Sequence, residues 1–401
     1  MAHPSHRIRN ITGDGSDGWD LFYRAKDLIR QGVAVTELTI GEHDVKTDPA
    51  ILDAMHGAAK AGATGYASIP GIPELRAAVA ERAQRLTGVP TGPENVIVTP
   101  GGQAALFAAH QFVGDPGERA LHVDPYYPTY PGTIRAAGLV PVAVTARAEA
   151  GFEPTEEDLR AVGPGARSLL VNSPNNPTGV IYSDRTLEAI ARVAAEHDLW
   201  VISDEVYDSQ VWEGRHLSPR ALPGMAERTL VVGSLSKSHA MTGSRLGWII
   251  GPPEAADLLW DLSTVSNYGI PGFIQEAGVF ALAQGPGYET GIAEPFRRRR
   301  EITQRLLSGQ DVVRAAPQRG AMYAMLDVRA TGLTGEGFAM RLLDEERIAV
   351  LPGESFGQAS AGHVRIAMTV EDRAYEDALA RIMVLAQRIA AQRAHFPAEI
   401  G

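Results

Sequence analysis

The chain alternates between short apolar runs and longer segments whose apolar residues recur every three or four positions. Apolar runs predict strands at residues 95–99, 120–123, 140–145, 168–172, 199–203, 229–233 and 246–250. Most of these runs are apolar throughout, as expected when helices cover both faces of a parallel sheet. The gaps between them hold helical patterns, such as residues 184–197, which Ser183 is placed to cap. The pattern predicts an α/β fold.

One gap between predicted strands is shorter than the others. Residues 234–245 leave little room for the crossover helix that a parallel connection requires. We therefore expect one antiparallel strand in an otherwise mostly parallel sheet.

The N-terminal region predicts a helix that packs on another part of the molecule. Between residues 18 and 30, aromatic and aliphatic residues recur at three- and four-residue spacings. A short strand is expected at 35–40. Asp48 followed by Pro49 then signals the start of a further helix, with a side-chain cap and a proline at the first helical position.

The pattern changes after residue 292 to a long charged helix that contains four arginines at positions 297–300. A smaller α+β unit follows, with strands expected near 321–326, 348–351 and 364–368. We therefore expect an N-terminal arm with part of a small domain at 1–44, a large domain at 45–290, and the rest of the small domain at 291–401.

Composition and charge favour small-molecule chemistry. The 401 residues are 44% hydrophobic and 21% charged, as in ordinary globular proteins. A net charge of −11 argues against nucleic-acid or anionic-membrane partners. The absence of cysteine excludes disulfides and thiolate sites, and the scattered histidines have no metal-binding spacing, so no metal is expected. With no secretory signal and no membrane-length apolar run, we expect a cytoplasmic protein.

Candidate chemistry gathers around Lys237. It follows the apolar run at 229–233, and Ser234 and Arg245 lie close to it in the sequence. A lone lysine is usually a solvated surface residue. Here an amine, a hydroxyl and a guanidinium occur together beyond a buried strand. This set suits an aldehyde cofactor that carries a phosphate.

Two further motifs precede the lysine segment. Residues 172–179 read Asn-Ser-Pro-Asn-Asn-Pro-Thr-Gly, and residues 203–207 read Ser-Asp-Glu-Val-Tyr directly after an apolar run. The carboxyl ends of buried strands are where ligands bind in open α/β sheets. The three motifs, in this order, resemble those of the pyridoxal-phosphate-dependent aminotransferases of fold type I, aminotransferase class I/II. The resemblance extends over residues 19–388.

The resemblance implies a fold and an assembly. The large domain would hold a mostly parallel seven-stranded sheet with one antiparallel strand, flanked by helices, and a small α+β domain would accompany it. The protein would be a homodimer with shared active sites, in which Tyr66 reaches the cofactor phosphate of the neighbouring subunit.

The resemblance also assigns residues to pyridoxal 5′-phosphate. Lys237 would form the internal aldimine, Asp204 would keep the pyridinium nitrogen protonated, and Tyr207 and Asn176 would bind the ring hydroxyl oxygen. Tyr127 would stack on the ring, where many relatives carry tryptophan. The phosphate would be bound by Gly101, Gly102, Gln103, Ser234 and Arg245.

Substrate recognition is expected at Arg365, because a guanidinium pairs with a carboxylate through a two-point fork. In the family, the backbone N–H of Gly41 and the side chain of Asn176 would assist it. Gln103 and residues 265–270 are expected near the side-chain pocket. Neither offers a cation for a second carboxylate, which favours an aromatic, aliphatic or other side chain over a dedicated aspartate enzyme.

The resemblance implies transfer of an amino group from an L-amino acid to a 2-oxo acid by a ping-pong mechanism. Some members of the family instead cleave a carbon–sulfur bond by β-elimination, and that alternative stays open. A distant alternative is a serine hydrolase, because residues 353–357 spell G-x-S-x-G around Ser355. Only His363 follows the serine, too close for the usual order of acid and histidine. A cofactor-binding regulator would need an added DNA-reading module.

Overall fold

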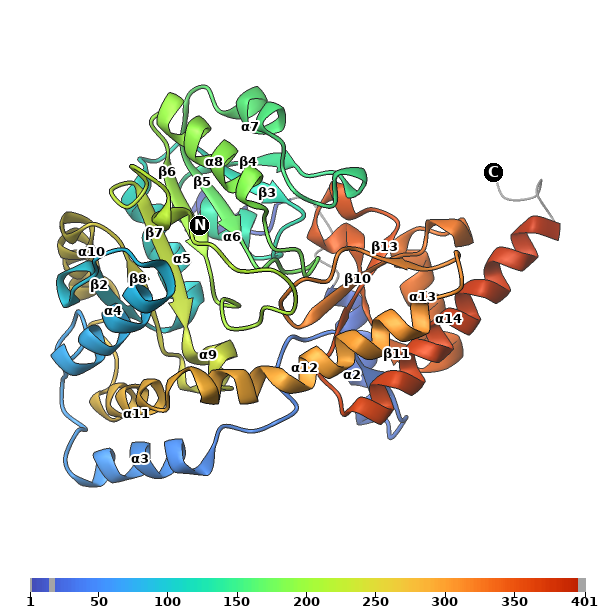
Figure 1. The fold of residues 1–401 in the computed structure, drawn as a ribbon, viewed down its shortest axis with the longest axis horizontal. Coiled ribbons are helices and arrows are strands. Elements are labelled where there is room, and N and C mark those ends of the chain that lie inside the picture. The colour runs from blue at the N-terminus through green and yellow to red at the C-terminus, as the bar shows by residue number, and fades with distance from the viewer. Residues whose placement is uncertain (1, 14–18, 396–401) are drawn as a thin grey trace.

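The central feature of the computed structural model, which describes residues 2–13 and 19–395, is a seven-stranded sheet (Figure 1). Its order is β2-β8-β7-β6-β5-β3-β4. The strands are β2 (Val96–Thr99), β3 (Arg119–Asp124), β4 (Val140–Thr145), β5 (Ala166–Asn172), β6 (Trp200–Asp204), β7 (Thr229–Ser234) and β8 (Gly247–Ile250). β8 runs antiparallel to both of its neighbours, and the other pairings are parallel. The predicted fold class is confirmed.

The antiparallel strand follows from the short connection before it. Between β7 and β8 the chain forms only α9 (Leu235–Ser238) and the 3-10 turn η4 (Thr242–Ser244). Neither is long enough to carry the chain back across the sheet, so β8 returns beside β7.

Helices cover both faces of the sheet, because alternate residues of each strand point to opposite sides. The helices are α4 (Pro73–Thr87), α5 (Gly101–Val113), α6 (Tyr130–Ala136), α7 (Glu156–Val162), α8 (Asp184–Glu196), α10 (Pro253–Ser266) and α11 (Gly272–Ala283). On β5, Leu169 packs with Leu187 of α8, whereas Leu170 packs with the core around α5, α6 and α10. Ser183 caps α8 as predicted.

The second unit combines N- and C-terminal segments. A four-stranded sheet has the order β12-β13-β10-β9, and β1 pairs with β11 in parallel. Its elements are α2 (Trp19–Arg30), β1 (Thr36–Glu37), β9 (Arg314–Ala315), β10 (Tyr323–Asp327), α13 (Gly335–Glu346), β11 (Ile348–Ala349), β12 (Leu351–Pro352), β13 (His363–Ala367) and α14 (Asp372–His395). In Figure 1 these elements lie together on one side of the large sheet. Residues of α2, β10, α13, β11, β13 and α14 share one apolar core.

Two predicted strands are wrong in extent. The strand expected at 35–40 is only Thr36–Glu37, because only these residues pair with β11. The strand expected at 348–351 is divided at Val350, since β11 pairs with β1 while β12 pairs with β13 in the other sheet. The first residue of the expected helix at 18–30 lies outside the described residues, and α2 begins at Trp19.

α3 (Pro49–Lys60) begins at the predicted Asp48 cap and packs on α11.

α12 (Gly285–Leu307) begins earlier than the helix expected after residue 292. Gly285 and Pro286 look like a turn in sequence, but proline is tolerated in a first helical turn. The proposed domain boundary at 290/291 therefore lies inside α12, and the division remains a proposal.

A carboxylate joins the two units next to the large sheet. Asp124, at the end of β3, accepts hydrogen bonds from the backbone N–H groups of Gln358 (3.0 Å) and Ala359 (3.3 Å). A Cβ atom at Gly357 would lie 2.0 Å from this carboxylate, so the close approach requires glycine.

None of the helices in the described part of the chain is long and apolar enough to cross a membrane.

Candidate active site

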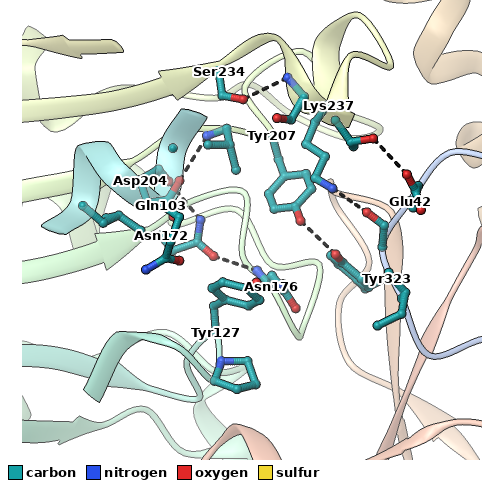
Figure 2. Close-up of a pocket in the computed structure, with 18 of the residues that line it drawn as sticks. Glu42, Gln103, Tyr127, Asn172, Asn176, Asp204, Tyr207, Ser234, Lys237 and Tyr323 are labelled. Carbon is teal, nitrogen blue, oxygen red and sulfur yellow. Dashed lines mark hydrogen bonds between the residues drawn. The ribbon is translucent and has the colours of Figure 1, made fainter. Parts of the chain in front are cut away.

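A cavity of about 370 Å³ opens where the carboxyl ends of β5, β6 and β7 face the second unit. Most of the residues predicted from sequence line it: Gly41, Gly102, Gln103, Tyr127, Asn176, Asp204, Tyr207, Ser234, Lys237, Arg245 and Arg365. Figure 2 shows side chains from both units pointing into this space. The fold thus brings together residues that are as far apart in sequence as Gly41 and Arg365.

Lys237 lies on the short helix α9 and is partly buried. Its Nζ donates a hydrogen bond to the carbonyl oxygen of Gly41. The pKa of Lys237 is lowered to about 8, chiefly by burial; Glu42 and Asp204 oppose this shift, and the cations Arg365 and Arg245 add to it. A substantial neutral fraction near neutral pH makes this amine a competent nucleophile and base.

Asp204 ends β6 with its carboxylate buried. The Tyr130 hydroxyl donates to Oδ2 at 2.7 Å, and the Val206 N–H donates to Oδ1 at 3.3 Å. Burial raises the pKa of Asp204 to about 6. Within the described residues no lysine or arginine forms an ion pair with this carboxylate. A buried carboxylate without a cation at contact distance fits a protonated ring nitrogen.

Asn172, Asn176 and Tyr207 form a polar wall beside Asp204. The Asn172 side chain donates to the carbonyl oxygen of Asp204 at 2.9 Å and accepts from the Asn176 N–H at 2.8 Å. The Tyr207 hydroxyl lies 2.8 Å from the hydroxyl of Tyr323, which comes from β10 (Figure 2). The Asn-Pro-Thr-Gly motif is therefore fixed to the end of β6.

Arg245 and Ser234 supply groups in this cavity that suit an anion. Arg245 has a left-handed backbone (φ 50°), and its guanidinium lies against Gly101, where a Cβ atom would come within 2.5 Å of Nη2. Gly101 does not line the cavity itself, but it begins α5, whose next two residues, Gly102 and Gln103, do, and a helix N-terminus suits an anion. The Ser234 side chain accepts a bond from the Ser236 N–H at 2.8 Å.

Gln103 lines the cavity, and its side chain is hydrogen-bonded to two neighbouring threonines. Its Nε2 donates to Thr133 Oγ1 at 2.7 Å, and its Oε1 accepts from Thr129 Oγ1 at 2.9 Å. Both ends of the amide are therefore held by α6 and the residue before it.

Arg365 is 3% exposed and lies on β13 between two aromatic rings. Its Cζ lies 4.4 Å from the ring centre of Tyr323 and 4.6 Å from that of Phe356. Nη1 donates to Asn176 Oδ1 at 2.9 Å and Nη2 donates to the Thr39 carbonyl, while Nε has no partner. No carboxylate pairs with Arg365 among the described ion pairs, so the guanidinium fits an incoming carboxylate.

Comparison with known proteins decides the family. The family model for aminotransferase class I and II matches residues 33–382. The chain belongs to this family. It is 39% identical to the arginine–pyruvate transaminase of Pseudomonas aeruginosa, over 96% of this chain and 98% of that protein. It is also 39% identical to the aspartate/prephenate aminotransferase of Thermus thermophilus, over 89% of this chain and 92% of that protein.

Solved structures of aminotransferases share the fold. The aspartate aminotransferase of Thermus thermophilus with maleate has a TM-score of 0.88 and 37% identity, and the alignment covers 95% of this chain and all of that one. The aromatic aminotransferase of Pyrococcus horikoshii has a TM-score of 0.84 and 32% identity, covering 91% of this chain and 100% of that one. The protein is an enzyme, an aminotransferase of fold type I.

Pyridoxal 5′-phosphate is the cofactor of this aminotransferase family, and the cavity suits it. The amine of Lys237 suits its aldehyde, the buried carboxylate of Asp204 suits its ring nitrogen, and Arg245 with Ser234 suits its phosphate. The Tyr127 ring offers an apolar face to the same space.

Tyr66 is a predicted site residue that lies outside this arrangement. It does not line the cavity and is 92% exposed, with its ring edge-on to Tyr268 at 5.1 Å. Its predicted role depends on a second subunit and stays a prediction.

The structure gives no support to a hydrolase site in this aminotransferase. Ser355 is buried in the 3-10 turn η6 (Gly353–Phe356) and does not line the cavity. His363 Nδ1 contacts the Ala361 carbonyl, and no described hydrogen bond connects the serine and this histidine. The G-x-S-x-G spelling instead marks the turn whose Gly357 packs on Asp124.

Sequence reasoning did not single out three polar residues of the site. Asn172 ends β5, so the strand-end rule that found Asp204 could also have found it. Tyr130 had no clear signal, because Tyr127 lies before α6 and the three-residue spacing does not place both side chains on one helical face. No feature of the sequence indicates Tyr323, because the residues around β10 do not show that its hydroxyl contacts that of Tyr207.

Proposed function

We propose that the enzyme moves the amino group of an L-amino acid to a 2-oxo acid at this cavity. The observation that carries the proposal is the position of the Lys237 amine, with its depressed pKa, in one cavity with Asp204 and Arg365. The reaction needs an amine, a buried carboxylate and a guanidinium around its cofactor, and among the described ion pairs this guanidinium has no carboxylate partner.

The first task of the chain is to hold the cofactor. Arg245, Ser234 and the turn at Gly101–Gln103 would bind the phosphate, and the Tyr127 ring would pack against the cofactor ring. Tyr207 and Asn176 would donate to the ring oxygen. Asp204 would pair with the ring nitrogen, and such an ion pair would offset the cost of burying its carboxylate.

The cofactor supplies an aldehyde that takes up the amino group and a ring that withdraws electrons from the substrate α-carbon. Lys237 would hold the cofactor through its aldehyde before substrate binds. Its Nζ, once free, would accept the proton of the substrate α-carbon and give a proton back at the same place. A pKa near 8 allows the same amine to accept and donate near neutral pH.

Arg365 orients the substrate through its α-carboxylate, and the Gly41 N–H assists. The unpaired Nε of Arg365 leaves a donor free for this contact. Amino acid and 2-oxo acid carry the same α-carboxylate, so they occupy the same place in turn. A ping-pong order follows, because the first product must leave before the second substrate binds.

The substrate side chain is proposed to lack a second carboxylate. Among the described residues, the cations that line the cavity are Lys237, Arg245 and Arg365, and each already has a role. Trp19, Ile40 and Leu351 contribute apolar surface. The relatives named above carry the names of different amino acids, so their names do not choose among side chains.

We also propose a homodimer with shared sites, in which Tyr66 of one chain reaches the phosphate held by the other. The high exposure of Tyr66 outside its own cavity supports this arrangement. The chain then divides into the arm and small-domain part at 1–44, the large domain at 45–290 and the C-terminal small domain at 291–401.

The test is a half-reaction screen with the cofactor-loaded enzyme. Single amino acids are added without any 2-oxo acid, and the absorption change of the bound cofactor is recorded. Conversion of the cofactor with release of a 2-oxo acid supports transfer. Catalytic release of pyruvate from a cysteine-type substrate, with the cofactor unchanged, would identify the carbon–sulfur lyase instead. Borohydride reduction followed by peptide mapping must also find the cofactor on Lys237.

A further inference from the structure

A buried ion cluster lies behind the active site, outside the cavity. Its centre is Arg82 on α4, whose side chain is 7% exposed. Nη1 and Nη2 donate to the two carboxylate oxygens of Asp208 at 2.6 and 2.9 Å. Nε and Nη2 donate to those of Glu289 at 2.9 and 2.6 Å. One guanidinium therefore holds one buried carboxylate, Glu289, and one largely buried carboxylate, Asp208, each through two hydrogen bonds.

The first carboxylate belongs to the turn that carries Tyr207. Asp208 is the next residue, and the turn after β6 is closed by bonds from Asp208 N–H to the Glu205 carbonyl (3.0 Å) and from Gln210 N–H to the Tyr207 carbonyl (2.8 Å). Fixing the Asp208 side chain through Arg82 therefore restrains the backbone of Tyr207.

The second carboxylate leads to the segment that carries Lys237. Glu289 lies on α12 beside Tyr288, whose ring stacks on His239 with centres 5.3 Å apart. His239 follows α9 and is held by contacts to the Ala281 carbonyl (3.1 Å) and to Ser238 Oγ (2.8 Å). Its ring is thus fixed two residues beyond Lys237.

We propose that Arg82 is a positioning residue that fixes the Tyr207 hydroxyl relative to the Lys237 amine. This inference rests on the proposed function, in which these two groups act on the same cofactor. Burying three ionised side chains is costly, and apolar residues would stabilise a core as well or better. Arg82 binds Asp208 in the turn of Tyr207 and Glu289 on the helix that packs near Lys237. This connection is a role for the cluster that stability alone does not explain.

The test uses Arg82→Lys in the cofactor-loaded enzyme, which keeps the charge and removes the fork. The visible absorption of the bound cofactor is titrated against pH, and thermal unfolding is measured alongside. A donor to the ring oxygen favours its anionic form, so a displaced Tyr207 raises the apparent pKa of the absorbing group. We expect a rise of roughly 0.5–1 unit, equivalent to about one hydrogen bond.

A double variant separates positioning from stability. In the Tyr207→Phe background, Arg82→Lys should leave the apparent pKa unchanged, because the hydroxyl it positions is gone. Arg228→Lys is the matched control: Arg228 pairs with Asp198 at 3.0 Å, at the far end of the same sheet. It should alter unfolding without moving the titration.

Two results would overturn the proposal. One is an unshifted titration in Arg82→Lys with lowered thermal stability, which makes the cluster structural only. The other is a shift that persists without the Tyr207 hydroxyl. Asp208→Asn, which weakens the fork on the turn of Tyr207, replaces Arg82→Lys if that variant does not fold, and the same outcomes apply. If the parent enzyme carries no cofactor on Lys237, the proposed function fails and not this inference alone.

Discussion

The hydroxyl oxygens of Tyr207 and Tyr323 lie 2.8 Å apart, so a turn of the large sheet meets a strand of the small one inside the active-site cavity. The two rings are edge-on, with centres 5.7 Å apart. A Cβ atom at position 41 would lie 1.8 Å from the Tyr323 oxygen, so Gly41 is required for this contact. Tyr323 therefore links the proposed cofactor contact at Tyr207 to the segment that accepts a bond from Lys237.

Tyr323→Phe should reduce activity moderately. The substitution removes the partner of the buried Tyr207 hydroxyl while keeping the ring against Arg365. The lost hydrogen bond is worth about 0.5–1.5 kcal/mol, so kcat/KM should fall roughly two- to tenfold. Steady-state kinetics measure this, and an unchanged kcat/KM would show that the contact does not orient Tyr207.

Much of this site can be predicted from the sequence because several of its residues lie at the carboxyl ends of apolar strands. Asp204 and Lys237 follow apolar runs that form β6 and β7, and the ends of parallel strands share one edge of a sheet. The short connection after β7 correctly predicts an antiparallel neighbour. The family resemblance then adds Arg365, which lies far along the chain.

The rest depends on packing that no local pattern records. Tyr323 meets Tyr207 only because the small sheet docks on the large one, and the Tyr130 contact to Asp204 needs α6 folded against β6. The chain from 348 to 352 is apolar throughout, yet it changes sheets at Val350. Whether such a run makes one strand or two is decided by its partners.

Asp204→Asn should fold and bind the cofactor but transfer amino groups far more slowly. A neutral amide no longer favours the protonated ring nitrogen. By analogy with other preorganised electrostatic groups, we expect a loss of roughly 10²-fold or more in kcat. Single-turnover absorption measurements check this. Ser355→Ala is the control and should keep full turnover, since Ser355 does not line the cavity; near-normal turnover in Asp204→Asn would refute the role.

Arg365→Ala should weaken both substrates together. Amino acid and 2-oxo acid present the same α-carboxylate to the same guanidinium, while no proposed cofactor contact involves Arg365. Loss of a charge-assisted pair costs about 1.5–3 kcal/mol, which corresponds to a rise in KM of roughly tenfold or more. Kinetics with each substrate varied in turn measure the effect. If KM stays constant for both, Arg365 does not bind substrate.

Buried His110 should make the fold sensitive to acid. Neither ring nitrogen has a described partner, and burial, with a smaller effect of His122, lowers the pKa of His110 to about 3. The folded state keeps this ring neutral, whereas the unfolded chain binds a proton below about pH 6.5, so stability is lost as pH falls below that value. At pH 5, roughly 1.5 pH units below the unfolded-state pKa, the free energy of unfolding should be lower by about 2 kcal/mol, at about 1.4 kcal/mol per pH unit.

His110→Leu should remove that part of the pH dependence. Denaturant unfolding at pH 8 and pH 5 compares the wild type with His110→Leu and with His56→Gln, which alters an exposed histidine on α3. We expect a smaller difference between the two pH values only in His110→Leu. Equal differences in all three proteins would mean that other groups account for the acid sensitivity.

Mixed dimers of Lys237→Ala and Tyr66→Phe chains should contain one intact active site. If Tyr66 serves the site of the opposite chain, one site of the mixed dimer combines both substitutions, and the other receives an intact Lys237 and an intact Tyr66. Chains with different affinity tags allow the mixed dimer to be isolated and its cofactor affinity measured. The intact site should bind as tightly as wild type. If the tight site is missing, so that the mixed dimer shows only the weakened affinity of the Tyr66→Phe parent, or if the enzyme is an active monomer, Tyr66 does not act across subunits.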